Sequence, residues 1–224
     1  MTRLWWCFAA SALMAIGAGL TAAQPNWLLM LFKPLTTVLV IVHAASRGEA
    51  GQPQRRALLV GLGCSLVGDV ALLWPQQGFL PGLVSFLLAH VAYLVAFSRG
   101  VRLAARPLAF AAYGLLAGSL LMVLWPGVPQ PLRLPVLVYV VALSAMAAQT
   151  ASWAAVRRRD GLAAPAQAWC AALGGLLFVA SDATLAFNRF HSPVPASTLW
   201  ILASYWAAQW LIASSLAPRQ GLKA

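Results

Sequence analysis

The sequence predicts an all-α fold, a polytopic membrane bundle of eight transmembrane helices. Apolar residues make up 62% of the 224 residues and charged residues 8%, whereas soluble domains carry about 25% charged residues. The apolar residues also gather into eight runs of about 20 residues, the length at which a helix crosses the hydrocarbon core. Because so little polar surface cannot cover a water-facing globule, we expect residues 1–224 to form a single integral membrane domain.

The first half of the chain holds four of the predicted spans. They cover residues 4–22, 27–45, 57–74 and 80–98. The connections between them are short and polar, as in Trp74–Gly78 between the third and fourth spans. Such short connections predict antiparallel neighbours in the bundle.

The first span also has features of a secretory signal peptide, since Arg3 precedes an apolar run that ends at Thr21-Ala22-Ala23. The apolar run of about 17 residues is long for a signal core and long enough to cross a bilayer. We therefore expect a retained helix, and cleavage would leave the orientation of the other seven unchanged.

The second half of the chain holds the other four predicted spans. They cover residues 107–125, 135–156, 165–187 and 197–216. The charged connection Arg157–Gly161 separates the sixth from the seventh. No segment between spans is long enough to form a separate soluble domain.

The basic residues fix the predicted orientation. The chain has 15 Lys and Arg against 4 Asp and Glu, a balance that would indicate nucleic-acid binding in a soluble protein. Here twelve basic residues fall on the side that includes both termini, and only Arg133 and Arg189 fall on the other. Basic residues favour cytoplasmic loops. We therefore expect both termini in the cytoplasm, a bacterial inner membrane and no nucleic-acid partner.

Three charged residues lie inside predicted spans, namely Lys33, Asp69 and Asp182. A charge at the membrane centre costs about 2.5–3.5 kcal/mol on insertion scales, so such residues mark functional sites or buried partners. From the rise per residue, all three lie roughly 7–9 Å below the outer boundary. They occupy three different helices and share one depth.

Further polar side chains lie near this layer and are expected to face the bundle interior. They are His90 and Tyr93 on the fourth span, Tyr139 on the sixth, Asn188 and Arg189 at the end of the seventh, and Tyr205 and Gln209 on the eighth.

Cys7, Cys64 and Cys170 fall in apolar runs without metal-ligand spacing, and we expect buried thiols rather than disulfides or zinc ligands.

The two aspartates hint at an internal repeat. Asp69 and Asp182 lie 113 residues apart, close to half the chain length, in similar outward-going segments. With four helices in each half, a duplication would give a parallel four-plus-four repeat about an axis along the membrane normal. The two aspartates would then face each other across that axis.

A pair of membrane-buried carboxyl groups offers one acid and one base, because like charges placed close together do not both ionise. Such a pair suits hydrolysis of an ether-like bond through an oxocarbenium ion. In this interpretation Asp69 and Asp182 are catalytic, and Lys33 binds a phosphate or keeps one aspartate ionised. The structural alternative is that Lys33 and one aspartate form an ion pair that locks helices together. No metal or other cofactor is expected.

The sequence resembles the YhhN family, which includes the lysoplasmalogenases. The resemblance covers nearly the whole chain and is carried by several segments in order: Lys33-Pro34-Leu35-Thr36-Thr37; Ser65-Leu66-Val67-Gly68-Asp69 through Leu72, followed by Phe79, Gly82, Phe86, His90, Tyr93 and Phe97; Gly175-Leu176-Leu177-Phe178 leading into Ser181-Asp182 and Leu185; and Tyr205 with Gln209.

This resemblance implies an eight-helix membrane enzyme. Members of the family hydrolyse the vinyl ether bond of lysoplasmalogens to a fatty aldehyde and a glycerophosphocholine or glycerophosphoethanolamine. By resemblance, Lys33, Asp69, His90, Asp182 and Tyr205 are site residues. Tyr93, Tyr139, Asn188, Arg189 and Gln209 are added as candidate substrate-binding residues from the polar layer.

The sequence thus predicts a membrane-embedded hydrolase of a lysophospholipid, with membrane lipids as its surroundings and an oligomeric state that the sequence does not fix. The alternative is a proton-coupled carrier of a lipid or small metabolite, since intramembrane carboxylates and a two-fold repeat are typical of carriers too. A cavity open only toward the outer side favours the enzyme, and a path past both aspartates favours the carrier.

Overall fold

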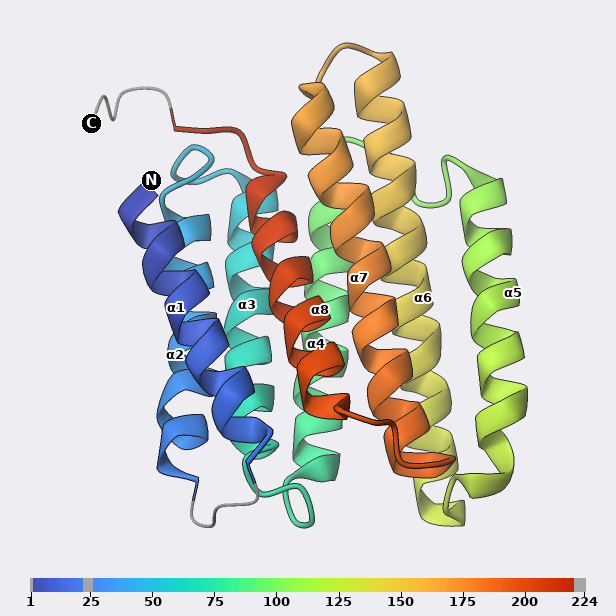
Figure 1. The fold of residues 1–224 in the computed structure, drawn as a ribbon. Coiled ribbons are helices and arrows are strands. Elements are labelled where there is room, and N and C mark those ends of the chain that lie inside the picture. The colour runs from blue at the N-terminus through green and yellow to red at the C-terminus, as the bar shows by residue number, and fades with distance from the viewer. Residues whose placement is uncertain (1, 22–25, 220–224) are drawn as a thin grey trace.

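The computed structural model describes residues 2–21 and 26–219, and it confirms the all-α class. Eight α-helices lie side by side in one bundle (Figure 1). Their bounds are α1 Thr2–Gly19, α2 Trp27–Ala45, α3 Pro53–Ala71, α4 Phe79–Phe97, α5 Pro107–Leu124, α6 Gln130–Arg159, α7 Pro165–Phe190 and α8 Ser197–Ser214, with a short 3₁₀ turn at Trp125–Gly127.

Prolines set several helix starts. Pro53, Pro107 and Pro165 each stand in the first turn of their helices, where the missing N–H costs nothing and the fixed φ suits the helix. α3 therefore begins four residues before the predicted span, because its charged first turn is helical although it is not apolar. α6 passes through Pro135 and is longer than predicted at both ends.

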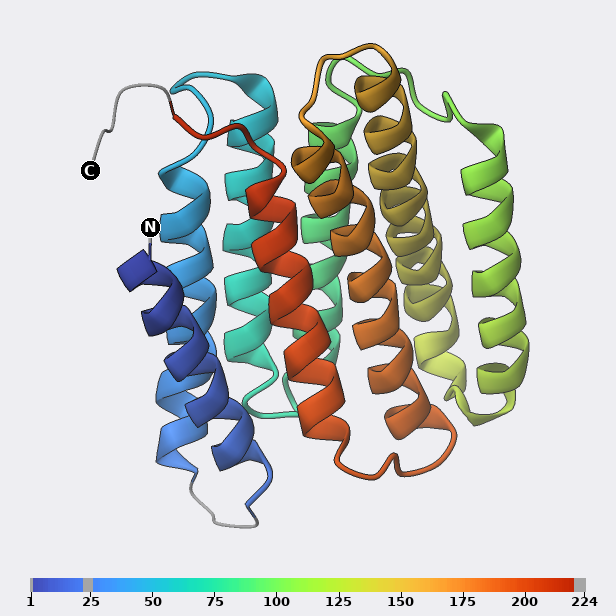
Figure 2. The same ribbon diagram turned by 45° about the horizontal axis from the view of Figure 1, so that its top comes forward.

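Five helices are long and apolar enough to cross a membrane by length and composition: α2, α4, α6, α7, and α5 together with its 3₁₀ turn. α1, α3 and α8 fall short of that criterion. α3 carries Gln54, Arg55 and Arg56 in its first turns, and α8 is rich in Trp, Ser and other weakly apolar residues. All eight helices lie alongside one another (Figure 2), which agrees with eight crossings. Because three of them do not meet the criterion of length and composition, eight crossings remain a prediction.

Small residues allow close approach between helices. A Cβ added at Gly68 of α3 would lie 2.6 Å from the ring of Phe86 on α4, and one added at Gly174 of α7 would lie 2.8 Å from Ile212 on α8. Small residues are the usual means of close packing between membrane helices. The cysteines differ in part from expectation: Cys64 and Cys170 are half-buried, whereas Cys7 is exposed on α1.

The helix neighbours agree with a four-plus-four repeat. Within each half, the second helix packs on the third and the third on the fourth. Between the halves, α2 packs on α8 and, equivalently, α6 packs on α4. α1 and α5 lie at opposite edges of the bundle (Figure 1). A two-fold axis between α4 and α8 would exchange α2 with α6 and α4 with α8, and would therefore relate these two contacts to each other. The helix neighbours thus support the predicted repeat.

The loops after α2, α4 and α6 lie at the same end of the bundle as the described ends of the chain (Figure 1), and these segments carry most of the basic residues. Arg47 follows α2 and donates to the backbone oxygens of Ser214 and Leu216 at the end of α8. Arg55 donates to the backbone oxygens of Ala45 and Arg47. We call the end of the bundle that carries these arginines the basic end. Lys223, counted there from sequence, lies outside the described residues.

Candidate active site

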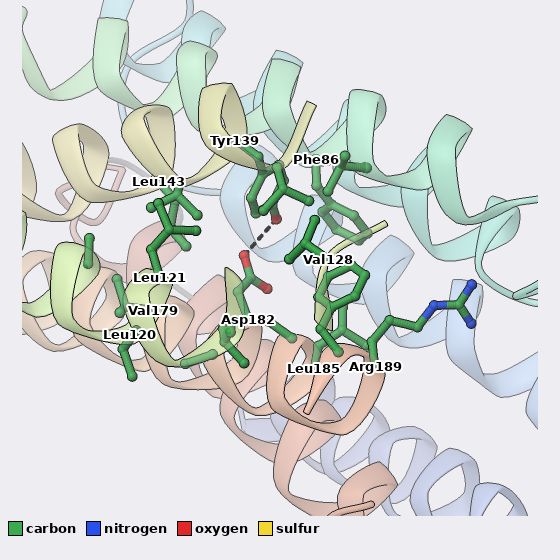
Figure 3. A pocket seen from close by; sticks show the side chains of 18 of the residues that line it. Phe86, Leu120, Leu121, Val128, Tyr139, Leu143, Val179, Asp182, Leu185 and Arg189 are labelled. Atoms are coloured by element: carbon green, nitrogen blue, oxygen red, sulfur yellow. Dashed lines mark hydrogen bonds between the residues drawn. The ribbon is translucent and has the colours of Figure 1, made fainter. Parts of the chain in front are cut away.

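A cleft lies between α4, α5, α6 and α7 near the end of the bundle opposite the basic end (Figure 3). It holds about 890 Å³ of space free of protein atoms, a volume that includes the solvent at its open mouth. α5 forms one wall loosely, since Leu124 is the residue of that helix that is buried. Apolar side chains dominate the lining, including Leu83, Phe86, Leu120, Leu121, Val136, Val140, Leu143, Val179 and Ala186.

Asp182 is the carboxyl group on the wall of this cleft. The Tyr139 hydroxyl donates to Asp182 Oδ2 at 2.6 Å, and His90 Nε2 lies 3.3 Å from the same oxygen. Among the described residues, no hydrogen bond reaches Oδ1, and Figure 3 shows the second oxygen turned away from Tyr139. The carboxyl group is therefore held through one oxygen and presents the other to the cleft.

His90 is fully buried behind Asp182 and Tyr139. Its Nε2 lies 2.9 Å from the Tyr139 hydroxyl oxygen, whose proton is directed to Asp182, so Nε2 carries the hydrogen and donates. Nδ1 is buried and has no partner among the described residues. His90 therefore contacts Tyr139 and Asp182 through Nε2 alone.

Asp69 lies in a different environment, 1% exposed in the core. Lys33 Nζ lies 3.8 Å from its Oδ1. The hydroxyls of Thr37 and Tyr205 donate to its Oδ2 at 2.6 and 2.8 Å. Both oxygens are thus occupied, and a cation balances the carboxylate, as buried charges require. Among the described residues, this is the one ion pair formed by Lys or Arg.

A chain of hydrogen bonds extends from Asp69 into the core. Gln209 Nε2 donates to the Tyr205 hydroxyl at 3.2 Å, and its Oε1 accepts from the Tyr93 hydroxyl at 2.7 Å. Ser65 Oγ lies 3.3 Å from that same Tyr93 oxygen. Tyr93, Tyr205 and Gln209 are each at most 4% exposed. These three predicted binding residues belong to a closed internal network and do not line the cleft.

Aromatic rings separate the two carboxyl groups. Phe178 packs edge-on against His90 with ring centroids 4.7 Å apart and against Tyr205 at 5.6 Å. Phe86 lies edge-on to Tyr205 at 5.7 Å and lines the cleft. The cleft is lined by Asp182 and not by Asp69. Asp69 and Asp182 were expected to share one site. Instead, Asp182 lines the cleft and Asp69 lies in the core.

Asn188 and Arg189, the two candidates at the outer end of the seventh predicted span, lie in different surroundings. Arg189 lines the cleft, stacks over Phe79 with its guanidinium carbon 4.8 Å from the ring centroid, and extends away from the cleft interior (Figure 3). Asn188 does not line the cleft; its Oδ1 accepts from the Val194 backbone N–H at 3.0 Å. Arg189 is therefore placed at the mouth, whereas Asn188 fixes the loop after α7.

The sequence reasoning missed two features of this region. Thr37 donates to Asp69, and its position one turn after Lys33 on the same helix was the available signal. The wall contributed by α5 had no signal, because its residues at the cleft, such as Leu120 and Leu121, are apolar like those that face lipid.

A family model describes this arrangement of segments. The model of the YhhN family matches residues 28–216. The chain belongs to the YhhN family. Proteins similar to this chain occur in both animals and bacteria, and no solved structure matches the chain.

Three relatives illustrate the range of the family. Lysoplasmalogenase TMEM86B of Sus scrofa is 33% identical over 89% of this chain and 80% of its own length. Lysoplasmalogenase TMEM86A of Bos taurus is 34% identical over 88% of this chain and 81% of its own. A lysoplasmalogenase of Mycobacterium bovis is 33% identical over 79% of this chain and 66% of its own. The YhhN match thus extends over nearly the whole bundle.

Proposed function

We propose that this YhhN-family protein is a lysoplasmalogenase-like hydrolase that cleaves the vinyl ether bond of a lysoplasmalogen. The products would be a fatty aldehyde and glycerophosphocholine or glycerophosphoethanolamine. The observation that carries the proposal is a carboxyl group, Asp182, on the wall of a predominantly apolar cleft. The name shared by the relatives supports the same activity.

The cleft suits a single hydrocarbon chain that ends in a polar headgroup. Its walls are aliphatic and aromatic side chains from four helices, and Arg189 stands at its mouth. With the chain among Leu120, Leu121 and Val140, the headgroup phosphate lies toward Arg189. The first atoms of the chain, where the vinyl ether is located, then pass Asp182.

Asp182 supplies the proton in this proposal. Protonated Asp182 gives its proton from Oδ1 to the vinyl carbon that does not bear oxygen, and the carbon that bears oxygen becomes an oxocarbenium ion. Asp182, now a carboxylate, stabilises that cation and accepts a proton from the water that attacks it. The resulting hemiacetal collapses to aldehyde and alcohol, and the proton count balances over the cycle.

Tyr139 and His90 are positioning residues for this step. Both hold Oδ2 of Asp182, so Oδ1 is directed to the substrate. Among the described residues, no Lys or Arg lies within ion-pair distance of Asp182. Asp69 is paired with Lys33 instead, and we propose that it acts from the core through Tyr205 rather than on the substrate.

The proton-coupled carrier is less well supported. A second pocket lies at the basic end, lined by residues such as Gln52, Trp153 and Leu216, and it shares no lining residue with the cleft. Phe97, Met146 and Gln149, all buried, fill the core at intermediate depth. A site reached from one end suits hydrolysis with release to the same side. We further propose that the basic end faces the cytoplasm of a bacterial inner membrane.

The test is aldehyde release by the purified protein in liposomes that contain a lysoplasmalogen. The matched negative substrate is the saturated ether analogue, which cannot form the oxocarbenium ion by protonation at carbon. Activity on the vinyl ether alone, abolished in Asp182→Asn, is the expected result. Equal hydrolysis of an ester lysophospholipid, or full activity in a folded Asp182→Asn protein, would refute the proposal.

A further inference from the structure

A second pocket opens at the basic end of the bundle, where α3 and α7 begin and α6 and α8 end. It is lined by Gln54, Arg99, Trp153, Arg157, Leu162 and Leu216, among others. It belongs to neither carboxyl cluster, and the proposed hydrolysis does not use it.

The side chains of this pocket carry hydrogen-bond donors without acceptors. Trp153 is 2% exposed, and its Nε1 is buried with no partner among the described residues. The same holds for Arg157 Nε and Gln54 Nε2. Buried polar atoms in proteins are nearly always paired, so three orphaned donors at one pocket require an explanation.

Several oxygens at the end of α8, beside the pocket, take part in hydrogen bonds with other groups. The backbone oxygens of Ser214 and Leu216 accept from Arg47, and that of Ala217 accepts from the Gly48 N–H. The Ser215 hydroxyl donates to the Ile212 oxygen. These oxygens at the end of α8 do not accept from Trp153, Arg157 or Gln54.

The charged side chains that line the pocket are positive. Arg99 and Arg157 both line the pocket, and neither forms an ion pair with a carboxylate among the described residues. The Arg157 guanidinium carbon lies 5.6 Å from the Trp153 ring centroid, which holds the cation over the ring. The first turns of α3 and α7 add the positive ends of two helix dipoles.

We propose that this pocket binds a phosphate-type oxyanion. Arg157 and Arg99 provide charge, and Trp153 and Gln54, which line the pocket and have N–H donors without a partner among the described residues, provide neutral donors. Leu162 and Leu216 give the pocket apolar walls. The oxyanion comes either from the headgroup of a phospholipid in the adjoining leaflet or from a soluble phosphate compound.

The experiment measures ligand-induced shifts in the thermal unfolding of the detergent-purified protein. Inorganic phosphate, short-chain phosphatidic acid and chloride are titrated separately at equal ionic strength. A shift with phosphate supports a soluble source, and a shift with phosphatidic acid alone supports a lipid headgroup. Shifts no larger than those with chloride overturn the proposal.

Three variants make the test specific. Arg157→Gln should weaken binding by about 10- to 100-fold and Trp153→Phe, which keeps the ring, by about 3- to 10-fold. Arg159→Gln removes the same charge from an exposed position two residues along α6 and should bind like the wild type. Equal loss in Arg159→Gln and Arg157→Gln would indicate nonspecific charge attraction and overturn the assigned pocket.

Discussion

The buried pair of Lys33 and Asp69 yields a quantitative prediction about stability. Lys33→Met removes the cation and leaves Asp69 in the core with the Thr37 and Tyr205 hydroxyls as its donors. At a separation of 3.8 Å and an effective dielectric constant of 20, the lost attraction is about 4 kcal/mol. This agrees with the roughly 3–5 kcal/mol found when one partner of a buried ion pair is removed.

The double variant Lys33→Met/Asp69→Asn should recover more than half of that loss. The amide introduced by Asp69→Asn retains an oxygen that accepts from Thr37 and Tyr205, and no charge then remains without a partner. The single variant Asp69→Asn should also destabilise the protein, because it leaves the Lys33 ammonium buried. The measurement is a double-mutant cycle of unfolding free energies in mild detergent.

A coupling energy of about 2 kcal/mol or more between the two sites is the expected outcome. Lys33→Met together with Asp69→Leu, which removes both polar groups, serves as a check on the role of the Thr37 and Tyr205 donors. If the two single losses simply added, within about 0.5 kcal/mol, the pair would contribute no mutual stabilisation and the assignment of Asp69 to the core network would be wrong.

Three further predictions concern the cleft and the packing around it. Asp182→Asn should lower kcat by at least about 100-fold while leaving the unfolding temperature unchanged, and a parallel fall in both would contradict a chemical role. Tyr139→Phe should lower kcat by about 10- to 100-fold by removing one hydrogen bond to a carboxyl group, with KM little changed in steady-state assays of aldehyde release. Gly68→Ala should destabilise by about 1–3 kcal/mol because its Cβ meets the Phe86 ring, whereas Gly63→Ala on the same helix meets no atom within 4 Å and should stabilise slightly in the same unfolding assay.

Much of the fold follows from apolar run length and proline position. The predicted second span coincides with α2, and those of α4 and α5 differ by one residue at most at each end. α3 and α6 were harder, because helices in membranes continue beyond the apolar run. Arg55 and Arg157 lie in helical turns at the basic end, and hydropathy gives no signal for turns in that region.

The sequence predicted the polar residues of the region, but not their division into two separate networks. Depth alone placed Lys33, Asp69 and Asp182 in one layer, and the structure pairs Lys33 with Asp69. Which carboxyl group faces a cavity depends on how each helix is rotated and on the rings between them. Phe178 appears in the sequence as one more apolar residue, yet it lies between His90 and Tyr205 and divides the two networks.

The contacts of the two aspartates follow the pattern that the predicted internal repeat would give. Each lies on the third helix of its half, and each accepts from the second helix of the same half: Asp69 from Thr37 on α2, and Asp182 from Tyr139 on α6. Each is also approached from the fourth helix of the other half, Asp69 by Tyr205 on α8 and Asp182 by His90 on α4.

The difference between the halves lies in charge and in the outermost helix. Lys33 neutralises Asp69, and α1 packs against α8 as well as α2, closing that side of the bundle. In the second half α5 packs mainly on α6 and leaves the cleft beside Asp182. A carboxyl group without a Lys or Arg partner among the described residues and an open wall thus occur together at Asp182. The proposed mechanism requires both, since it needs a proton donor and space for a lipid chain beside it.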